Sequence, residues 1–450
     1  MPSPFAHQAG GLAVALACLC ATTPSWSLDL AQAYALALEQ DATIRTARAA
    51  AAAGRERLPQ ARAQFLPNLS ASASRFKNSL ETTAPDFLGR TTTSDDHYTS
   101  SSEALTLRQP LFRPLLMAQH RQARAVVDDA NATLAREEQN LVVRVTQAYF
   151  ETLLAEEQLT LVGIQKATYT AQVDAARKGF AGGSGTRTDI DEAQARLDLT
   201  IAQELEARQN VDLARRQLQA LIGRPVLEPV APVDVGVLPL APPAPASVEE
   251  WTSRAEASSP EVASARAQLE AARADVERAQ AGHYPTLDAI AQISRNNNDN
   301  ITRPNTRFHQ KQVGVQLAVP LFQGGYVNSQ VREALALVDR AGGRLEALRH
   351  DLGVRVHREF RGVTEGVLRV RALEQAVRST EQLAESSRRS FAAGARTRLD
   401  ILNAEQQAGA ARRDLAQARF SYVVARVRLK ALAGDLQADN ISEVNAWLRH

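Results

Sequence analysis

Two acidic turns are the part of this 450-residue chain whose residue types and spacing could do chemistry. The first is GSGTRTDI at residues 183–190, and the second is GARTRLDI at residues 394–401. Each turn places an aspartate six residues after a glycine, Asp189 in the first and Asp400 in the second, 211 positions later. A carboxylate beside arginines can bind cations, form ion pairs or cap a helix. The turns therefore predict either an electrostatic site or a pair of helix caps.

The other candidate reactive residues do not form a constellation. His350 and His357 are seven residues apart on a predicted helix, about 10 Å, so one metal ion could not bridge them directly. The GGSG stretch at residues 182–185 lacks the Lys-Ser/Thr of a phosphate-binding loop and follows no strand. We therefore predict that the protein is not an enzyme and has no cofactor and no metal site.

Composition and charge exclude several classes of partner. The net charge of +2 balances 52 cationic against 50 anionic residues, and no block of one sign stands out. Nothing in this distribution predicts nucleic-acid binding.

The first 27 residues predict an export signal. The apolar run at residues 10–21 is too short to span a bilayer, and small residues precede a cut before Leu28. Cys18 and Cys20 both lie in this segment, so the mature chain would have no cysteine and no disulfide. The alternatives are an unprocessed tail and a lipoprotein cut before Cys18.

Beyond the signal, the chain is a tandem repeat. The motif LTLRQPLF at residues 105–112 recurs in similar form as VQLAVPLF at 315–322, and LQALIG at 218–223 recurs as LKALAG at 429–434. The whole pattern divides the chain into units whose predicted limits are listed together: signal peptide 1–27, first repeat 28–223, linker 224–247, second repeat 248–434, C-terminal tail 435–450. The linker carries seven of the chain's 19 prolines, which predicts an extended segment.

Within each repeat, heptads predict a hairpin of long helices. After each acidic turn, apolar and small residues recur every seven positions along two seams, and alanine dominates one of them. The seams of the second repeat run through Ile401, Ala408, Leu415, Tyr422, Leu429 and through Ala404, Ala411, Ala418, Ala425, Leu432. Residues 113 to about 179 contain no proline after Pro114, so they predict a helix roughly 100 Å long.

Between the helical segments the period falls to two. Apolar residues alternate with polar ones near residues 69–73, 105–107, 287–293 and 313–319, which predicts two hairpins of roughly ten-residue strands. Their tips, residues 80–98 and 296–308, are polar and are expected to be loops facing outside the cell. Ten residues of alternating polarity are typical of a membrane β-strand. Four strands cannot close a barrel, and open edges in lipid leave backbone groups unpaired, so three chains would be needed to give twelve strands.

The chain resembles the TolC family of bacterial outer-membrane channel proteins. The motifs are LPNLSASAS, LRQPLF, VPLFQGG, RVTQAYFETLLAEEQL, TDIDEAQARLDL and GARTRLDILNAE, in order and partly duplicated. The resemblance implies a mainly α fold with a membrane β portion: a homotrimer whose 12-stranded barrel crosses the outer membrane and continues as an α-helical barrel across the periplasm. It also implies a periplasmic adaptor and an inner-membrane pump, either an ABC transporter or a proton-driven one, with outer-membrane lipid as surroundings.

The resemblance implies a gate at the acidic turns. Asp400 would face the pore, giving a ring of three carboxylates, while Asn403 stands where a second acidic ring would lie and makes that ring neutral. Arg396 would tie neighbouring helices shut through Asp189. Phe391 stands where some members have tyrosine, so a hydroxyl link would be missing. The alternative is that both aspartates simply cap helices.

The cargo remains open between two hypotheses. The motif RVTQAYFETLLAEEQL and the lack of a lipid-anchor cysteine in the mature chain favour type I secretion of a protein such as a toxin over multidrug or metal efflux. A periplasmic coiled-coil adaptor is the alternative of another class, but adaptors usually carry one helical hairpin, whereas this chain has two.

Overall fold

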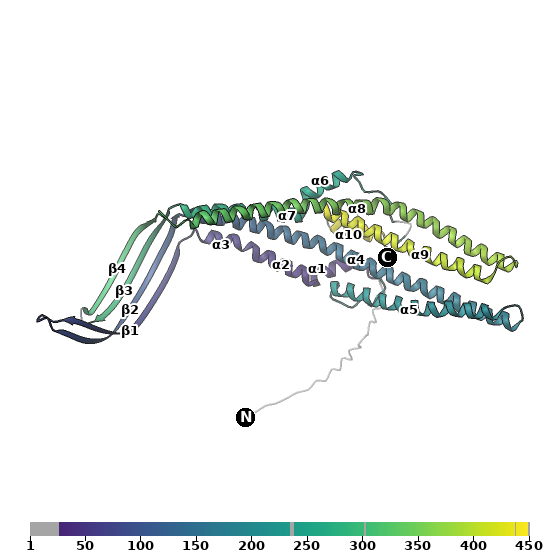
Figure 1. Cartoon of the computed structure of the whole chain (residues 1–450), viewed down its shortest axis with the longest axis horizontal. Coiled ribbons are helices and arrows are strands. Elements are labelled where there is room, and N and C mark those ends of the chain that lie inside the picture. Colours follow the sequence, from purple (N-terminus) through teal and green to yellow (C-terminus); the bar gives the residue numbers. More distant parts are fainter. Residues whose placement is uncertain (1–26, 235–237, 301–302, 437, 449–450) are drawn as a thin grey trace, which may run out of the picture.

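The computed structural model describes residues 27–234, 238–300, 303–436 and 438–448. The predicted signal peptide lies outside the described residues, except for residue 27. The chain is elongated, with a four-stranded sheet at one end and the turns of two helical hairpins at the other (Figure 1).

Two pairs of long helices make up most of the length. The helix α4 (Pro114–Ala181) has 68 residues and α8 (Tyr326–Ala392) has 67, about 100 Å each. The helices α5 (Arg187–Ile222) and α9 (Arg398–Leu432) fold back along them. Both predicted hairpins and the predicted length of the first long helix are confirmed.

Shorter helices begin each repeat and end the chain. These are α1 (Leu30–Gln40), α2 (Ala42–Arg55) and α3 (Arg57–Ala63) before the first strand, α6 (Val248–Ser258), α7 (Pro260–Gln280) and the 3-10 turn η1 (Ala281–His283) before the third, and α10 (Ala438–Asn445). The predicted limits at residues 223 and 248 fall directly after α5 and at the first residue of α6.

The helices pack through small side chains. The predicted alanine seam of α9 is buried at Ala404, Ala411 and Ala418, and the equivalent seam of α5 is buried at Ala193 and Ala207. Alanine at these positions lets two helix backbones approach closely without leaving cavities. None of the described helices is long and apolar enough to cross a membrane.

The strands form one antiparallel sheet of order β1-β2-β3-β4. They are β1 (Asn68–Pro85), β2 (Thr91–Phe112), β3 (Thr286–Asn300) and β4 (Arg303–Ala318). The strands are longer than the predicted ten residues, and the segment 80–98, predicted as a loop, is mostly paired strand around a turn at 86–90. The strands are longer because pairing continues well beyond the apolar region, through β-branched threonines such as Thr83 and Thr93, which lie opposite each other. Of the second predicted tip, 301–302 lie outside the described residues and the rest is strand.

The two faces of the sheet differ in polarity. One row crosses all four strands as Leu69, Leu107, Ala291 and Val313, and its side chains lie on the face formed by odd-numbered residues, the apolar face. The next row is Ser70, Thr106, Gln292 and Gln312, on the polar face. Leu69 is 64% exposed and Val313 is 89% exposed, so no described part of the chain covers these positions of the apolar face. The predicted alternation is therefore confirmed, and both edge strands are left with unpaired backbone groups.

An ion triad joins the sheet to the helices. The Asp288 carboxylate accepts hydrogen bonds from Arg108 (2.6 Å) on β2 and from Arg113 (2.8 Å), the residue before α4. The side chain of Asp288 is only 3% exposed. A buried carboxylate with two guanidinium partners fixes the angle at which the strands enter the long helices.

The proline-rich linker is extended, as predicted, but it is also packed into the molecule. Val230 forms a bridge with Leu28, and Val226, Val230 and Ala231 are buried. The buried Tyr149 hydroxyl donates to the carbonyl oxygens of Leu28 (2.9 Å) and Ala231 (3.1 Å). Burial raises the pKa of Tyr149, so this hydroxyl remains a donor at neutral pH.

Candidate functional site

The turns of the two helical hairpins have the same backbone geometry. Gly183 and Gly394 both have left-handed φ values, +72° and +75°, which disfavour any side chain there. The Gly183 N–H donates to the Phe180 carbonyl (3.1 Å), and Gly394 N–H donates to the Phe391 carbonyl (2.9 Å). The duplicated motif therefore encodes a duplicated turn that ends one helix and starts the next.

Both aspartates close capping boxes at the start of the returning helix. The Asp189 carboxylate accepts from the Thr186 backbone N–H and hydroxyl, both at 2.8 Å, and the Asp189 N–H donates to the Thr186 hydroxyl. Asp400 makes the same three bonds with Thr397, at 2.9, 2.7 and 3.3 Å. The helix-cap interpretation is thus confirmed as a structural role for both residues.

Capping also sets the charge of these carboxyls. Hydrogen bonds from the Thr397 side chain and backbone, with a further contribution from Arg396, lower the pKa of Asp400. Bonds from Thr186, and the charge of Arg398, lower the pKa of Asp189. Within one chain, both carboxylates are therefore ionised at neutral pH.

The structure does not bring Arg396 and Asp189 together within one chain. The Arg396 guanidinium donates instead to the Ser387 hydroxyl (3.3 Å). None of the ion pairs among the described residues joins Arg396 to Asp189. The Phe391 ring lies under the guanidinium of Arg398, 5.4 Å from the ring centroid, in a cation–π contact.

Asn403 lies at a contact that sequence reasoning missed. Its side-chain oxygen accepts from Arg196 (3.0 Å), and a second nitrogen of Arg196 donates to Gln406 (2.9 Å). Arg196 is on α5 and both acceptors are on α9, so this one side chain links the two hairpins. Nothing in the sequence pointed to it, because its partners are more than 200 residues away.

A second link between the hairpins is centred on Glu405. Gln172 of α4 donates to one carboxylate oxygen (2.7 Å), and Arg388 of α8 donates to the other (2.8 Å). Near the tips, therefore, the hairpins are joined by hydrogen bonds between polar side chains, in contrast to the apolar packing near the linker.

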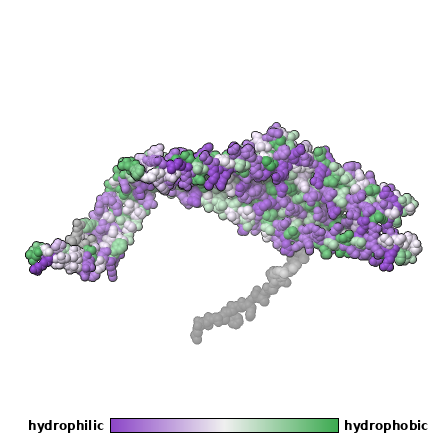
Figure 2. Space-filling model, in the orientation of Figure 1, coloured by the Kyte–Doolittle hydropathy of each residue, from purple (hydrophilic) through white to green (hydrophobic). Residues whose placement is uncertain are grey.

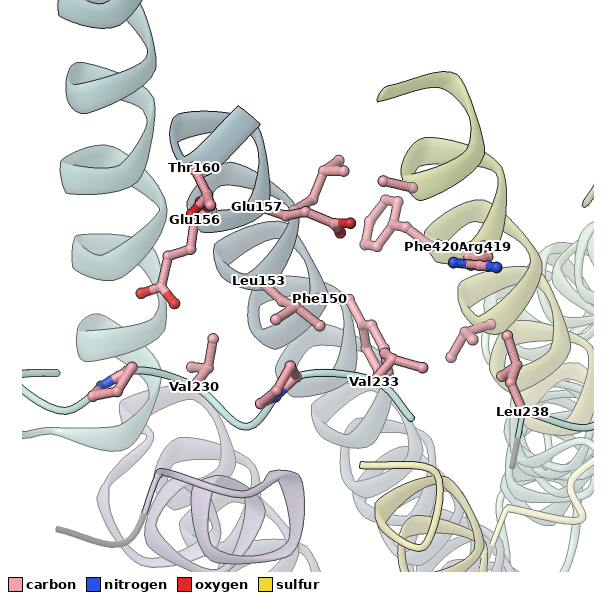
Figure 3. A pocket seen from close by; sticks show the side chains of 15 residues that line it. Phe150, Leu153, Glu156, Glu157, Thr160, Val230, Val233, Leu238, Arg419 and Phe420 are labelled. Atoms are coloured by element: carbon pink, nitrogen blue, oxygen red, sulfur yellow. The ribbon is translucent and has the colours of Figure 1, made fainter. Parts of the chain in front are cut away.

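Between the hairpins, closer to the linker, lies a groove of about 420 Å³ (Figure 3). Phe150 and Leu153 of α4 face Phe420 of α9 across it, and Val230 and Val233 of the linker form its floor. Two of its charged residues pair with neighbouring helices, Glu156 with Arg215 (2.6 Å) and Arg419 with Glu374 (3.0 Å). Burial raises the pKa of a third, Glu157. The groove is a packing gap between hairpins with no reactive constellation.

Two histidines, His350 and His357, are the candidate metal ligands considered from the sequence. His350 lies 3.8 Å from Glu346 on the same exposed helix surface. Among the described residues, no group of three or more histidine, cysteine or acidic side chains is placed to hold a metal ion.

Comparison with known proteins gives a consistent set of relatives. The family model described as outer membrane efflux protein matches residues 33–224 and 251–435. The alkaline protease secretion protein AprF of Pseudomonas aeruginosa is 35% identical over 436 residues, covering 94% of this chain and 88% of that protein. The proteases secretion protein PrtF of Dickeya chrysanthemi is 31% identical, covering 94% and 92%.

More distant relatives share the same extent. The outer membrane protein TolC of Escherichia coli is 27% identical over 93% of this chain and 84% of its own length. Among solved structures, CusC matches with a TM-score of 0.77 at 19% identity, covering 91% of this chain and 92% of that one.

Proposed function

The chain belongs to the outer membrane efflux protein family, and we propose that it forms the outer-membrane duct of a type I secretion machine that exports a protein. The predicted resemblance to the TolC family is confirmed. It is an outer-membrane channel protein that extends into the periplasm. The alternative of a periplasmic adaptor is set aside, because the family model covers both repeats. The assignment of protein as cargo rests on one observation: two protease secretion proteins match 94% of this chain at 35% and 31% identity.

The working unit in this proposal is a homotrimer. The sheet has two unpaired edges and an exposed apolar face, and unpaired backbone groups in lipid cost several kcal/mol each. Three sheets joined edge to edge would remove all open edges and turn the polar face toward the lumen. The returning helix α5 also exposes Leu199, Leu205 and Leu213, which supports a packing surface for a neighbouring protomer.

The gate in this proposal lies at the hairpin turns, at the end opposite the sheet. Asp400, with Asn403 and Phe391, would line the constriction, and Arg396 would close it through Asp189 of an adjoining hairpin in the trimer. The ionised state of both carboxylates and the exposed position of Arg396 support this arrangement. Opening would be a shift between two packings of the hairpins, favoured by adaptor contacts and involving no chemical reaction.

The partners in this proposal follow from the family. A channel of this kind works with a periplasmic adaptor and an inner-membrane transporter; for protein cargo, we assign an ABC transporter. Multidrug or metal efflux with a proton-driven pump is the second candidate, which the fusaric acid resistance protein FusA of Burkholderia cepacia favours at 30% identity over 48% of this chain. No catalytic role and no cofactor is assigned, since the family consists of channel proteins.

The cargo is tested by deleting the gene and comparing the proteins in the culture medium. The expected result is the loss of one or a few extracellular proteins, restored by a plasmid copy and by the Arg208→Ala variant, whose substitution leaves the tip contacts intact. Susceptibility to drugs and metals should not change. An unchanged set of extracellular proteins with increased drug or metal susceptibility would instead establish efflux.

A further inference from the structure

The cations of the sheet lie almost entirely on its apolar face. Five exposed lysine and arginine side chains have odd-numbered positions on that face: Arg75, Lys77, Arg295, Arg307 and Lys311. On the polar face of the described strands the only such residue is Arg108, which is held in the triad with Asp288. Elsewhere that face forms neutral hydrogen bonds, such as Gln312 to Gln292 (2.6 Å) and Ser102 to Asn296 (2.6 Å).

These five cations, which we name the basic belt, lie directly beyond the apolar rows. Lys311 is in the row of Leu105 and Ile293, and the following rows contain Arg295 and then both Arg75 and Arg307. The rows nearer the helices are apolar, and they end near Leu321, which lies between β4 and α8 and is 92% exposed. Figure 2 shows hydrophobic residues gathered where the sheet meets the helices. From Val319, just after β4, to Lys311 the chain extends about 26 Å, which a strand tilt of about 40° reduces to about 20 Å of height, against about 25 Å for a lipid-facing band.

The belt carries unbalanced positive charge. Among the residues whose side chains the structure describes, the only carboxylate in its rows is Glu103 on β2, which stands opposite Arg295. Within the described residues, none of the five cations forms an ion pair or a side-chain hydrogen bond. Four of them are on the edge strands, two on β1 and two on β4, so joining sheets edge to edge brings these cations to one seam. Like charges on adjacent strands repel, and an anion placed between them removes the repulsion.

We propose that the basic belt binds the phosphate-bearing headgroups of outer-leaflet lipid, most strongly at the three seams between protomers. This inference rests on the proposed function, since it requires a trimer whose apolar face lies in a bilayer. A cation on the lipid face is costly at the bilayer centre and nearly free of cost at the interface. The headgroup supplies the counter-charge there, and its acyl chains cover the apolar rows below. A free anion could satisfy the charge but would leave those rows uncovered.

The test uses the full-length trimer in detergent and native mass spectrometry with bisphosphorylated lipid A as the probe. The variant Arg75→Gln/Arg307→Gln removes one cation from each edge strand. A cation near an anionic surface contributes about 1 kcal/mol, so two should weaken lipid A binding about 30-fold. The control Arg332→Gln/Arg340→Gln changes the same charge on exposed residues of α8 and should bind like the parent. The charge-conserving variant Arg75→Lys/Arg307→Lys should also bind like the parent.

Further arms separate lipid phosphate from free phosphate. Lipid A stripped of its phosphates should bind the parent at least as weakly as the intact lipid binds the Gln variant, which keeps three of the five cations. Inorganic phosphate at about 10 mM should not displace the intact lipid. The proposal is overturned if a stable trimer of the Gln variant retains lipid A as the parent does, if the stripped lipid binds equally, or if inorganic phosphate displaces it. Failure of the parent to form a trimer at all would overturn the proposed function as well.

Discussion

Replacing Arg196 with alanine is expected to favour the open channel, because this side chain links the two hairpins of each protomer near the tip. Its guanidinium, 21% exposed, donates to Asn403 at 3.0 Å and to Gln406 at 2.9 Å. Hydrogen bonds that involve one charged partner contribute about 1.5–3 kcal/mol when buried, and we take about 1 kcal/mol each for this partly solvated site. The loss is then about 2 kcal/mol per protomer.

The trimer multiplies this effect if the hairpins move together. Three links sum to about 6 kcal/mol, and about 5.5 kcal/mol is enough to move a two-state equilibrium from 1:99 to 99:1. The assay is single-channel recording in planar bilayers, where Arg196→Ala should spend most of its time at the higher conductance. Arg196→Lys should be intermediate, because an ammonium lacks the fork that reaches two acceptors.

The matched control is Arg208→Ala on the same helix. Among the described residues, Arg208 pairs only with Glu204 of its own helix, at 2.6 Å, and does not reach the second hairpin. If Arg208→Ala raised the open fraction as much as Arg196→Ala, or if both conducted like the parent, the link between the hairpins would have no part in gating. Combining Arg196→Ala with Asn403→Ala should add little to the single change, since both remove the same contact.

Four further outcomes are expected. Asp400→Asn should weaken block by divalent cations in bilayers, whereas Thr397→Ala, which removes the cap but keeps the carboxylate, should not; equal effects of the two changes would leave only the capping role. Because capping by Thr397 lowers the pKa of Asp400 below its ordinary 3.8, the stabilisation it gives is present above that value and is lost as pH falls through the lowered pKa. The protection factors of the amides in the first turn of α9, which are exchange rates corrected for their intrinsic pH dependence, should therefore be constant between about pH 5 and 8 and fall only below about pH 4, and a fall near pH 6 would contradict this. Asp288→Ala should lower the stability of the trimer by about 1–3 kcal/mol per protomer, because Arg108 (48% exposed) and Arg113 (27% exposed) both lose their carboxylate partner. Glu81→Ala on the exposed end of β1 should change the stability little, and equal melting of the two variants would refute the triad argument. Tyr149→Phe should cost about 1–2 kcal/mol in unfolding experiments and increase protease cleavage in the linker, since it removes the hydroxyl that holds the linker; unchanged cleavage would mean that apolar packing alone holds it.

Elements that depend on local pattern could be predicted from the sequence alone. The heptads of the returning helices, the glycines at 183 and 394, and the alternation in the strands each involve residues close in the chain. Helix period, left-handed turns and strand faces follow from backbone geometry over a few residues, so duplicated motifs predicted duplicated structure. The capping alternative for the two aspartates could be recognised for the same reason, since a capping box spans only four residues.

The rest was decided by contacts between segments far apart in the chain. Register set the strand lengths, and with them the rows that place Arg75 and Arg307 together on one face. The Arg196 link to Asn403 and the Asp288 triad each join residues separated by more than 170 positions. Such partners leave no pattern in the nearby sequence, because a polar side chain bonds to whichever distant group the fold brings within about 3 Å of it. Alpha-helical and strand patterns decide what each segment becomes, but only packing decides which polar groups are buried together, and an unpaired buried charge is too costly to be left without a partner.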